Sequence, residues 1–362
     1  MSDHAHMGHA LALGRRGLGS VWPNPAVGCV IVAGGRVAGR GWTQAGGRPH
    51  AETVALAQAG SRARGATAYV TLEPCAHHGR TPPCAEALLA AGVARVVTAL
   101  EDPDPRVSGR GHAILRQGGA QVVIGLRAAE ARHDQAGFFM RVTQGRPLLT
   151  LKLATSLDGR IATASGESRW ITGPDARRAV HALRLEHDAV LVGGGTARTD
   201  DPRLTVRGLG AVRQPVRIVV SRKLDLPSAG TLAGSARDAP LWLVHGKEAP
   251  ADRIARWTAL GATCLDVPVT RGQLDPAAML AALGARGITR VFCEGGGSLG
   301  ASLLQAGLVD RLLGFSAGVA LGAEGQPALG ALGIHALADA PRFRLDESRS
   351  LGGDVLSRWT RR

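Results

Sequence analysis

The chain of 362 residues is poor in cysteine and has no long hydrophobic run. Its five cysteines are odd in number and scattered, which argues against a disulfide scaffold and favours a reducing compartment, so we expect a cytoplasmic protein. Arg95 interrupts the most apolar stretch, residues 87–100, so the sequence predicts no membrane span. The first residues lack the basic start and apolar stretch of a secretion signal.

Aromatic residues make up only 3% of the chain, so the core must be built from Ala, Val, Leu and Ile. Acidic residues are also few: the chain has 29 Asp and Glu compared with 43 Lys and Arg, which gives a net charge of +14. No long Lys/Arg block is present, and small phosphorylated substrates explain a positive cleft as well as nucleic acid does. A nucleic-acid base deaminase or a basic RNA-binding protein stays an alternative, although we expect no nucleic-acid partner. We expect His4, His6 and His9 to be solvated.

The length and the alternating patterns predict two α/β domains, residues 1–145 and 146–362, with the boundary at Gly145-Arg146-Pro147. In the first we expect a helix, a hairpin around Ala33-Gly34-Gly35, and then alternating helices and strands. In the second we expect strands at 148–155, 188–193, 215–221, 240–245, 289–294 and 311–319, and helices at 174–186, 275–286 and 299–307.

Residues 71–84, TLEPCAHHGRTPPC, are the part of the chain densest in metal-binding side chains. Upstream lies the segment RPHAETVAL, with His50 and Glu52 at the start of a predicted helix. His-x-Glu followed by Pro-Cys at a strand end is the signature of zinc nucleobase deaminases. One imidazole and two thiolates, from His50, Cys75 and Cys84, leave a fourth zinc position open for catalysis. Glu52 is placed to take a proton from water and pass it to a leaving group.

Each proposed ligand follows a proline, which limits the freedom of the metal-free site. Cys84 is also expected near a helix N-terminus, where the macrodipole favours a thiolate. We interpret His77 and His78 as substrate-loop or surface residues, because a fourth protein ligand would close the site. The remaining cysteines, Cys29, Cys264 and Cys293, are predicted to be core thiols.

The second half contains glycine-rich strand-to-helix junctions. At Gly295-x-Gly297-x-x-Gly300, backbone amides and a helix dipole can hold a phosphate group. A standard Rossmann domain is rejected, because Asp310 comes too early for the acidic residue that binds ribose.

The segments HAE, TLEPCAHHGRTPPC and PNPAVGCVIV resemble the bacterial bifunctional riboflavin-biosynthesis deaminase–reductase family, whose longer eight-residue cysteine spacing this chain shares. The resemblance implies a cytidine-deaminase-like α/β/α domain with zinc. It also implies hydrolysis of the 2-amino group of a diaminohydroxy-phosphoribosylaminopyrimidine. Asn24 matches a position that holds the base, although a turn residue between two prolines is an equal reading.

The second half is similar to the reductase half of the same family, which implies a dihydrofolate-reductase-like α/β fold and NADPH as donor. The positions that match the nucleotide side are Ala154, Trp170, Thr196, Asp200 and the glycine turn Gly296, Gly297, Ser298, Leu299, Gly300, Ala301 and Ser302. Those that match the substrate side are Ser168, Arg184, Leu204, Arg207 and Glu294.

Chemistry is compatible with these matches. Arg184 and Arg207 suit a ribose phosphate, and Glu294 suits sugar hydroxyls. Lys152 is a candidate to polarise the imine that accepts the hydride, with a surface lysine as the alternative. Asp158 is expected to shape a turn.

One segment departs from the family pattern. Ser221-Arg222-Lys223 stands where an aspartate is usual, and Arg222 or Lys223 can hold the 2′-phosphate of NADPH. A degenerate reductase half that serves as a scaffold is a further alternative. We expect a homo-oligomer that acts on a small phosphorylated pyrimidine, with no membrane partner.

Overall fold

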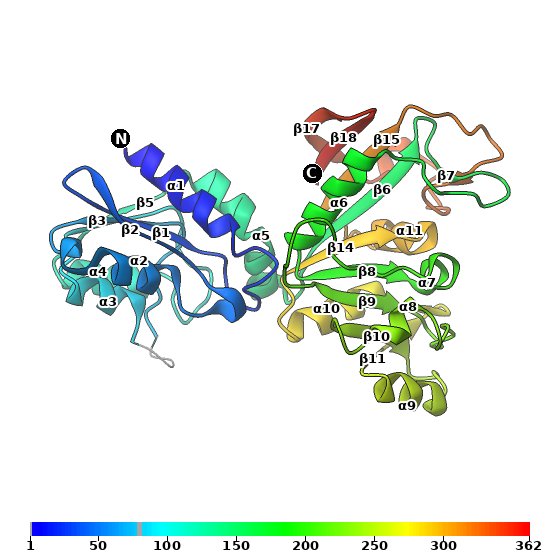
Figure 1. Cartoon of the computed structure of the whole chain (residues 1–362), viewed down its shortest axis with the longest axis horizontal. Coiled ribbons are helices and arrows are strands. Elements are labelled where there is room, and N and C mark those ends of the chain that lie inside the picture. Colours follow the sequence, from blue (N-terminus) through cyan, green and yellow to red (C-terminus); the bar gives the residue numbers. More distant parts are fainter. Residues whose placement is uncertain (1, 78–81) are drawn as a thin grey trace. The chain divides into compact units, whose positions relative to one another are not determined.

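A computed structural model describes residues 2–77 and 82–362 and divides the chain into two compact units, Met1–Gly145 and Arg146–Arg362 (Figure 1). Each unit has its own sheet, and each is described by itself below. Within the described ranges, no helix is both long and apolar enough to cross a membrane.

The first unit is built on a five-stranded sheet in the order β2-β1-β3-β4-β5. β1 is antiparallel to both of its neighbours, whereas β3, β4 and β5 run parallel to one another. Gly34 and Gly35 form the β1–β2 turn with positive φ angles, which only glycine adopts freely. The strands are β1 (Gly28–Ala33), β2 (Arg36–Trp42), β3 (Thr67–Val70), β4 (Arg95–Thr98) and β5 (Gln121–Ile124).

Helices cover both faces of this sheet, as Figure 1 shows. α1 (Asp3–Arg15) and α5 (Ala128–Gln144) lie together on one face. The opposite face carries α2 (Ala51–Ala59), α3 (Cys84–Ala90) and α4 (Arg110–Gln117). The core between these layers is almost entirely aliphatic, as the scarcity of aromatic residues predicts.

The second unit contains a nine-stranded sheet in the order β11-β10-β9-β8-β14-β6-β15-β18-β17. The strands from β11 to β15 are parallel. β18 pairs antiparallel with β15, and β17 pairs antiparallel with β18 at the edge of the sheet. The strands are β6 (Leu148–Ser156), β8 (Ala189–Gly193), β9 (Val216–Val220), β10 (Leu241–Gly246), β11 (Thr263–Val267), β14 (Arg290–Gly295), β15 (Arg311–Ala317), β17 (Phe343–Leu351) and β18 (Asp354–Arg361).

The helices of this unit lie between successive strands in the chain. They are α6 (Pro174–Leu185), α7 (Gly194–Asp200), α8 (Thr231–Gly234), α9 (Ala251–Ala259), α10 (Pro276–Ala285) and α11 (Gly297–Gln305). Four short strands form two small pairs: β7 (Arg160–Ala162) with β16 (Gln326–Pro327), and β12 (Val269–Thr270) with β13 (Gln273–Leu274). Because β8, β14 and β6 are parallel neighbours, their carboxyl ends share one edge of the sheet, where ligands of open α/β sheets bind.

The two α/β sheets and all the helices and strands predicted from the sequence are present, with ends shifted by a few residues. The sequence did not predict α7, α8, α9, β11 or the β17–β18 hairpin. α7 occupies Gly194 to Asp200, a segment for which the sequence predicted no helix. Strand β17 was missed because seven of its nine residues are exposed, so it has no core-facing alternation.

One expectation about a single side chain is wrong. His6 is not solvated, because its ring packs against Tyr69 with the ring centroids 5.1 Å apart and only 3% of it is exposed. Cys29 and Cys293 are fully buried as predicted, and Cys264 is partly buried against the core of the second unit. Asp158 does shape a turn, since it accepts hydrogen bonds from the Ser156 hydroxyl and the Leu321 and Gly322 amides.

Candidate active sites

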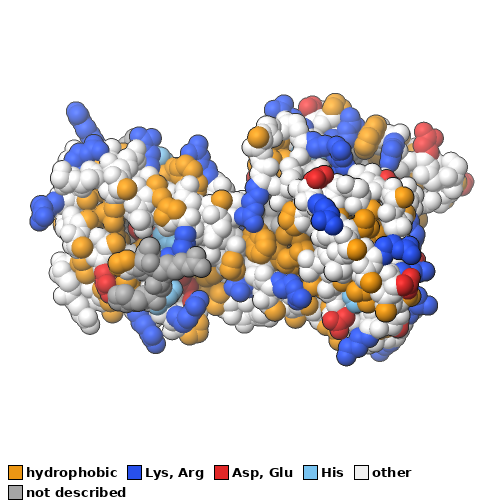
Figure 2. Space-filling model, turned by 60° about the horizontal axis from the view of Figure 1, so that its bottom comes forward, with side chains coloured by type: hydrophobic (Ala, Val, Ile, Leu, Met, Phe, Trp, Pro, Cys, Tyr) orange, Lys and Arg blue, Asp and Glu red, His pale blue; other side chains and the backbone are white. Residues whose placement is uncertain are grey.

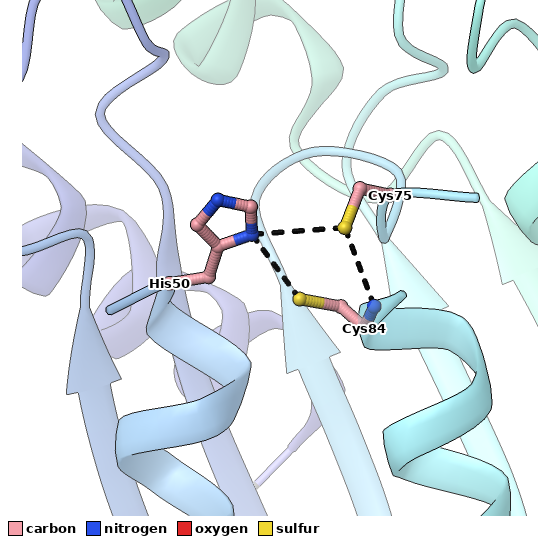
Figure 3. Close-up of side chains that lie close together, drawn as sticks. All are labelled: His50, Cys75 and Cys84. Carbon is pink, nitrogen blue, oxygen red and sulfur yellow. Dashed lines mark hydrogen bonds between the residues drawn. The ribbon is translucent and has the colours of Figure 1, made fainter. Parts of the chain in front are cut away.

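The first candidate site joins three ligand side chains from separate elements (Figure 3). His50 directly precedes α2, Cys75 lies in the loop after β3, and Cys84 is the first residue of α3. The His50 Nδ1 atom lies 3.3 Å from Cys84 Sγ and 3.6 Å from Cys75 Sγ. All three donor atoms lie within 4.8 Å of one another.

These distances fit a metal ion. Zinc bonded tetrahedrally to nitrogen at about 2.0 Å and to sulfur at about 2.3 Å places the two ligand atoms roughly 3.5 Å apart. The observed N–S separations of 3.3 and 3.6 Å agree with that value. The Cys84 amide also donates to Cys75 Sγ, which is the contact expected of a thiolate at a helix start. The residues therefore fit a zinc ion with one open position.

The contact between Cys75 and Cys84 shifts the pKa values of both thiols. A hydrogen bond from Cys84 lowers the pKa of Cys75 to about 4, and His50 contributes in the same direction. The same contact raises the pKa of Cys84. Hydrogen bonding to Cys75 raises the pKa of His50. These contacts favour the thiolate form of Cys75, the form that binds metal.

Glu52 lies in the first turn of α2, beside the metal-ligand cluster, and is 4% exposed. Burial, together with the negative charge of Cys75, raises its pKa to about 7. A carboxyl group with a pKa near the working pH can both accept and return a proton. Glu52, predicted from the sequence to be the general acid–base group, therefore lies beside the candidate ligands with a pKa that suits that role.

Asn24 lies against the segment that ends in His50. A Cβ atom at Gly47 would come within 1.9 Å of the Asn24 Nδ2 atom, so only glycine fits here. Gly47 also has a φ of 86°, which favours glycine independently. Asn24 thus packs against a residue three positions before His50. His77 is not part of the donor cluster, and His78 lies outside the described residues.

Glu73 is a buried site residue that the sequence did not reveal. It stands two positions before Cys75 and accepts hydrogen bonds from the backbone amides of Asp102, Gly109 and His112. Two of these amides belong to the start of α4, where a carboxylate is stabilised by the helix dipole. Glu73 thereby holds the loop after β4 against the strand end that carries Cys75.

The second candidate site lies at the carboxyl edge of the nine-stranded sheet. Glu294 on β14 forms a bidentate ion pair with Arg184 on α6. Arg184 also donates to the Thr205 carbonyl at 2.7 Å, and the Arg207 amide donates to His181 Nδ1 at 3.2 Å. Four of the predicted substrate residues, Arg184, Leu204, Arg207 and Glu294, therefore lie on segments that these contacts join.

Burial and neighbouring charges shift the pKa values of Glu294 and Lys152. Burial alone would raise the pKa of Glu294, but the charges of Arg184 and Lys152 hold it below its usual value. Burial lowers the pKa of Lys152, and Glu294 opposes that effect. Lys152 on β6 is therefore a partly enclosed lysine that interacts with Glu294 and Asp200, not a free surface side chain. His181, which contacts the Arg207 amide, was not predicted as a site residue. It stands three residues before Arg184 on the same face of α6, and this spacing could have indicated that it lies near the site.

Thr196, one of the predicted nucleotide residues, lies beside the N-terminus of α11. A Cβ atom at Gly296 would lie 3.2 Å from the Thr196 hydroxyl, and one at Gly193 would lie 3.7 Å from Leu299. α11 begins at Gly297, so the predicted glycine turn, 296–302, is the start of a nine-residue helix. Its free amides suit a phosphate group.

Other predicted residues lie in the loop before α6. Trp170 is 69% exposed, and the Arg177 guanidinium lies over its ring at 4.7 Å. The neighbouring Arg169 donates to the Asp200 carbonyl, which ties this loop to α7. Ser168 is partly buried in the same loop. Ala154, on β6 opposite Phe315 of β15, packs against the hydrophobic cluster below the sheet edge.

Ser221 lies next to the carboxylate of Asp225, four residues further along the chain. The Ser221 hydroxyl donates to Asp225 at 2.8 Å, and Arg198 pairs with the same carboxylate at 2.9 Å. The turn after β9 is therefore tied by a side-chain carboxylate four residues later. Arg222 is partly exposed and lies 3.7 Å from Glu248, and a Cβ atom at Gly272 would lie 3.9 Å from it.

Positive charge does not form a continuous surface on the face seen in Figure 2. Lys and Arg side chains there are dispersed among neutral and acidic ones. This distribution does not favour the nucleic-acid alternative, which calls for a basic stripe.

Comparison with known proteins identifies both halves. The model of the cytidine and deoxycytidylate deaminase zinc-binding region matches residues 1–100, and the RibD C-terminal domain matches residues 147–357. The chain is 43% identical to riboflavin biosynthesis protein RibD of Escherichia coli K12 over 98% of both chains. It is 40% identical to the Haemophilus influenzae protein of the same name, over 99% of this chain and 97% of that one.

Solved structures agree with this comparison. RibD of Acinetobacter baumannii has a TM-score of 0.88 at 38% identity and covers 99% of both chains. A Thermotoga maritima structure has a TM-score of 0.87 at 32% identity and covers 99% of this chain and 98% of its own. Its title describes a diaminohydroxyphosphoribosylaminopyrimidine deaminase and 5-amino-6-(5-phosphoribosylamino)uracil reductase.

Fold and sites together define a zinc-dependent deaminase domain followed by a nicotinamide-dependent reductase domain in one chain. The chain belongs to the RibD family, and it is a bifunctional deaminase–reductase of riboflavin biosynthesis.

Proposed function

We propose that the first domain, residues 1–145, deaminates 2,5-diamino-6-(5-phosphoribosylamino)pyrimidin-4(3H)-one. Water adds at C2, the C2–N bond breaks, and ammonia leaves as a C2 carbonyl forms. His50, Cys75 and Cys84 would hold zinc, which would acidify a water molecule and so make a nucleophile available at neutral pH. This proposal is supported by the convergence of these three donors beside one buried glutamate.

In this proposal Glu52 carries the proton. It accepts one from the attacking water and donates it to the departing amino group, which its raised pKa allows. Asn24, which packs against Gly47 in the segment that ends in His50, orients the pyrimidine. Its amide offers both a hydrogen-bond donor and an acceptor for this purpose.

The second domain, residues 146–362, then reduces the phosphoribosylamino side chain to phosphoribitylamino. Opening of the ribose ring would break the C1′–O4′ bond and move the amine proton to O4′, which gives the imine. NADPH bound to this domain would supply a hydride to the C1′ carbon, and a proton would be added to the nitrogen. We assign the polarising role to Lys152, and phosphate and sugar binding to Arg184, Arg207, Glu294 and the loop residues Ser168 and Leu204. The cofactor would lie against the segments of Ala154, Trp170, Thr196, Asp200, Arg222 and residues 296–302.

A coupled assay tests this order of reactions. With the diaminopyrimidine phosphate as substrate, we expect ammonia release first and loss of NADPH absorbance second. A zinc chelator is expected to stop both, because the reductase then receives no deaminated substrate. Adding the deaminated compound to the chelated enzyme should restore NADPH oxidation.

Each outcome separates the parts of the proposal. Ammonia without NADPH oxidation would refute the reductase role and leave the scaffold alternative. Failure to release ammonia from a zinc-loaded protein would refute the substrate assignment. We also propose that the enzyme acts in the cytoplasm and that it forms a homo-oligomer. Sedimentation of the full chain would test the oligomeric state.

A further inference from the structure

A second cluster of metal-binding side chains lies in the first unit, apart from the thiolate site. Glu73 follows β3, Glu101 follows β4, and His112 belongs to α4. One ligand atom from each lies within 4.8 Å of the other two. None of these side chains is a member of the His50, Cys75 and Cys84 group.

Glu73 has one acceptor position left. Its Oε2 atom accepts from the Asp102 and Gly109 amides, and its Oε1 atom accepts from the His112 amide. A carboxylate offers about four acceptor positions, so one remains on Oε1. That same atom lies 3.7 Å from the ring nitrogen Nδ1 of His112.

His112 contributes a buried nitrogen with no hydrogen-bond partner. The side chain is 1% exposed, and Nδ1 has no partner among the described residues. The other ring nitrogen, Nε2, lies 3.0 Å from the Thr98 hydroxyl. Burying a polar atom without a hydrogen-bond partner is unfavourable, so this nitrogen is available to bind a ligand. A histidine that binds metal through one nitrogen usually has its other nitrogen fixed by a hydrogen bond, as Thr98 fixes this ring.

The geometry and the charge both suit a divalent ion. The Oε1 and Nδ1 atoms are 3.7 Å apart. If an ion were bonded to both at about 2.1 Å, the Oε1–ion–Nδ1 angle would be roughly 120°, which is compatible with four- or five-coordination. Two carboxylates with a neutral imidazole carry a charge of −2, which such an ion balances. Glu101 is exposed, so its side chain can complete the site from the surface.

We propose that Glu73, Glu101 and His112 bind a second divalent transition-metal ion. One nitrogen and two carboxylate ligands, with water in the remaining positions, suit Zn²⁺, Mn²⁺, Fe²⁺ or Co²⁺ better than a soft ion. The ion joins the loop after β4 and the start of α4 to the strand end that carries Cys75. It is independent of the substrate and of the reductase.

Cobalt titration of the metal-free full chain tests this site. Co²⁺ at the cysteine site gives intense thiolate-to-metal charge-transfer absorption, whereas Co²⁺ at a site of nitrogen and oxygen does not. We expect two equivalents bound per chain by elemental analysis, with charge transfer saturating at one. His112→Ala should bind one equivalent and keep the charge-transfer band, and Cys84→Ser should lose the band and keep the other equivalent.

Two further variants make the result decisive. Glu101→Gln changes an exposed side chain and should weaken the second equivalent by about tenfold or more without altering the band. His9→Ala, a histidine on α1 outside both clusters, should bind two equivalents. One equivalent in the wild type, or two in both His112→Ala and Glu101→Gln, would overturn the proposal. If His112→Ala loses the band through misfolding, Glu101→Gln decides.

Discussion

At the scale of single residues, burial and neighbouring charge give ordinary side chains their special properties. Glu52 has a pKa near 7 because it is enclosed beside a thiolate, and Glu294 has a lowered pKa because Arg184 and Lys152 offset its burial. Both side chains are largely removed from solvent, yet their pKa values move in opposite directions because their neighbours differ. This difference suits one to proton transfer and the other to a fixed charge.

We predict that Glu52→Gln lowers ammonia release by at least about 100-fold, because the amide cannot take the proton. NADPH oxidation on the deaminated substrate should remain within twofold of the wild type. Zinc content, measured by elemental analysis, should stay the same, because Glu52 is not among the metal donors. Loss of both activities in a folded, zinc-loaded variant would contradict independent sites.

Arg184 offers a residue-scale test of the reductase site. Replacing it with Lys removes the bidentate pair with Glu294 and the bond to the Thr205 carbonyl. We expect KM for the deaminated substrate to rise about 10- to 100-fold, while KM for NADPH changes little. Arg178→Lys, on the same helix, is the matched control. Equal changes in the KM values for the deaminated substrate and for NADPH would show that Arg184 does not act on substrate binding alone.

At the scale of elements, buried polar side chains connect helices to strands. His187, just after α6, lies 2.6 Å from the Leu183 carbonyl and 3.1 Å from the Thr150 hydroxyl of β6. Asp188 accepts hydrogen bonds from the Thr289 and Arg290 amides and so joins the start of β8 to that of β14. These contacts fix the strands whose carboxyl ends carry the second site.

The environment of His187 predicts a pH dependence of stability. Burial, reinforced by the positive charge of Arg290, lowers its pKa to about 3 from an ordinary 6.5. The neutral ring therefore stabilises the fold fully above about pH 6.5, and this contribution is lost as pH falls toward 3.

Between pH 7.5 and pH 5.0 the loss amounts to about 2 kcal/mol in the unfolding free energy. Urea unfolding of wild type and His187→Gln at both values measures it. The variant should be the less stable protein at pH 7.5, with the difference shrinking by about 2 kcal/mol at pH 5.0. A difference that does not change with pH would show that His187 is not buried as a neutral ring.

At the scale of the whole molecule, the chain is two α/β units with separate cores and separate chemistry. The metal-ligand cluster belongs wholly to Met1–Gly145, and the Arg184–Glu294 pair wholly to Arg146–Arg362. Binding of a ligand to one folded unit stabilises that unit by mass action.

We therefore expect calorimetry of the full chain to show two transitions. A chelator should lower only the transition of the first unit, by roughly 5–10 °C, because zinc binds its folded state alone. NADPH should raise only the other transition. Cys84→Ser, which lacks a metal ligand, should melt at the lower temperature with or without chelator. Coincident shifts of both transitions would indicate strong coupling between the units.

Much of the architecture followed from local patterns. The hairpin at Gly34-Gly35, the alternation of helices with apolar strands and the boundary at Gly145 are encoded within short segments, so they were predicted. The β17–β18 hairpin was not, because its outer strand lies at the sheet edge with most side chains in solvent. Its position depends on pairing with β15, which no local pattern specifies.

The sequence by itself determined the zinc chemistry, because His50, Glu52, Cys75 and Cys84 are unusual residue types held in short, proline-flanked segments. Only the tertiary structure decided the roles of Glu73 and His181. Glu73 meets amides 29 to 39 residues away, and His181 meets the Arg207 amide 26 residues away. Such contacts arise from the packing of whole elements, so the residues that make them look ordinary until the chain is folded.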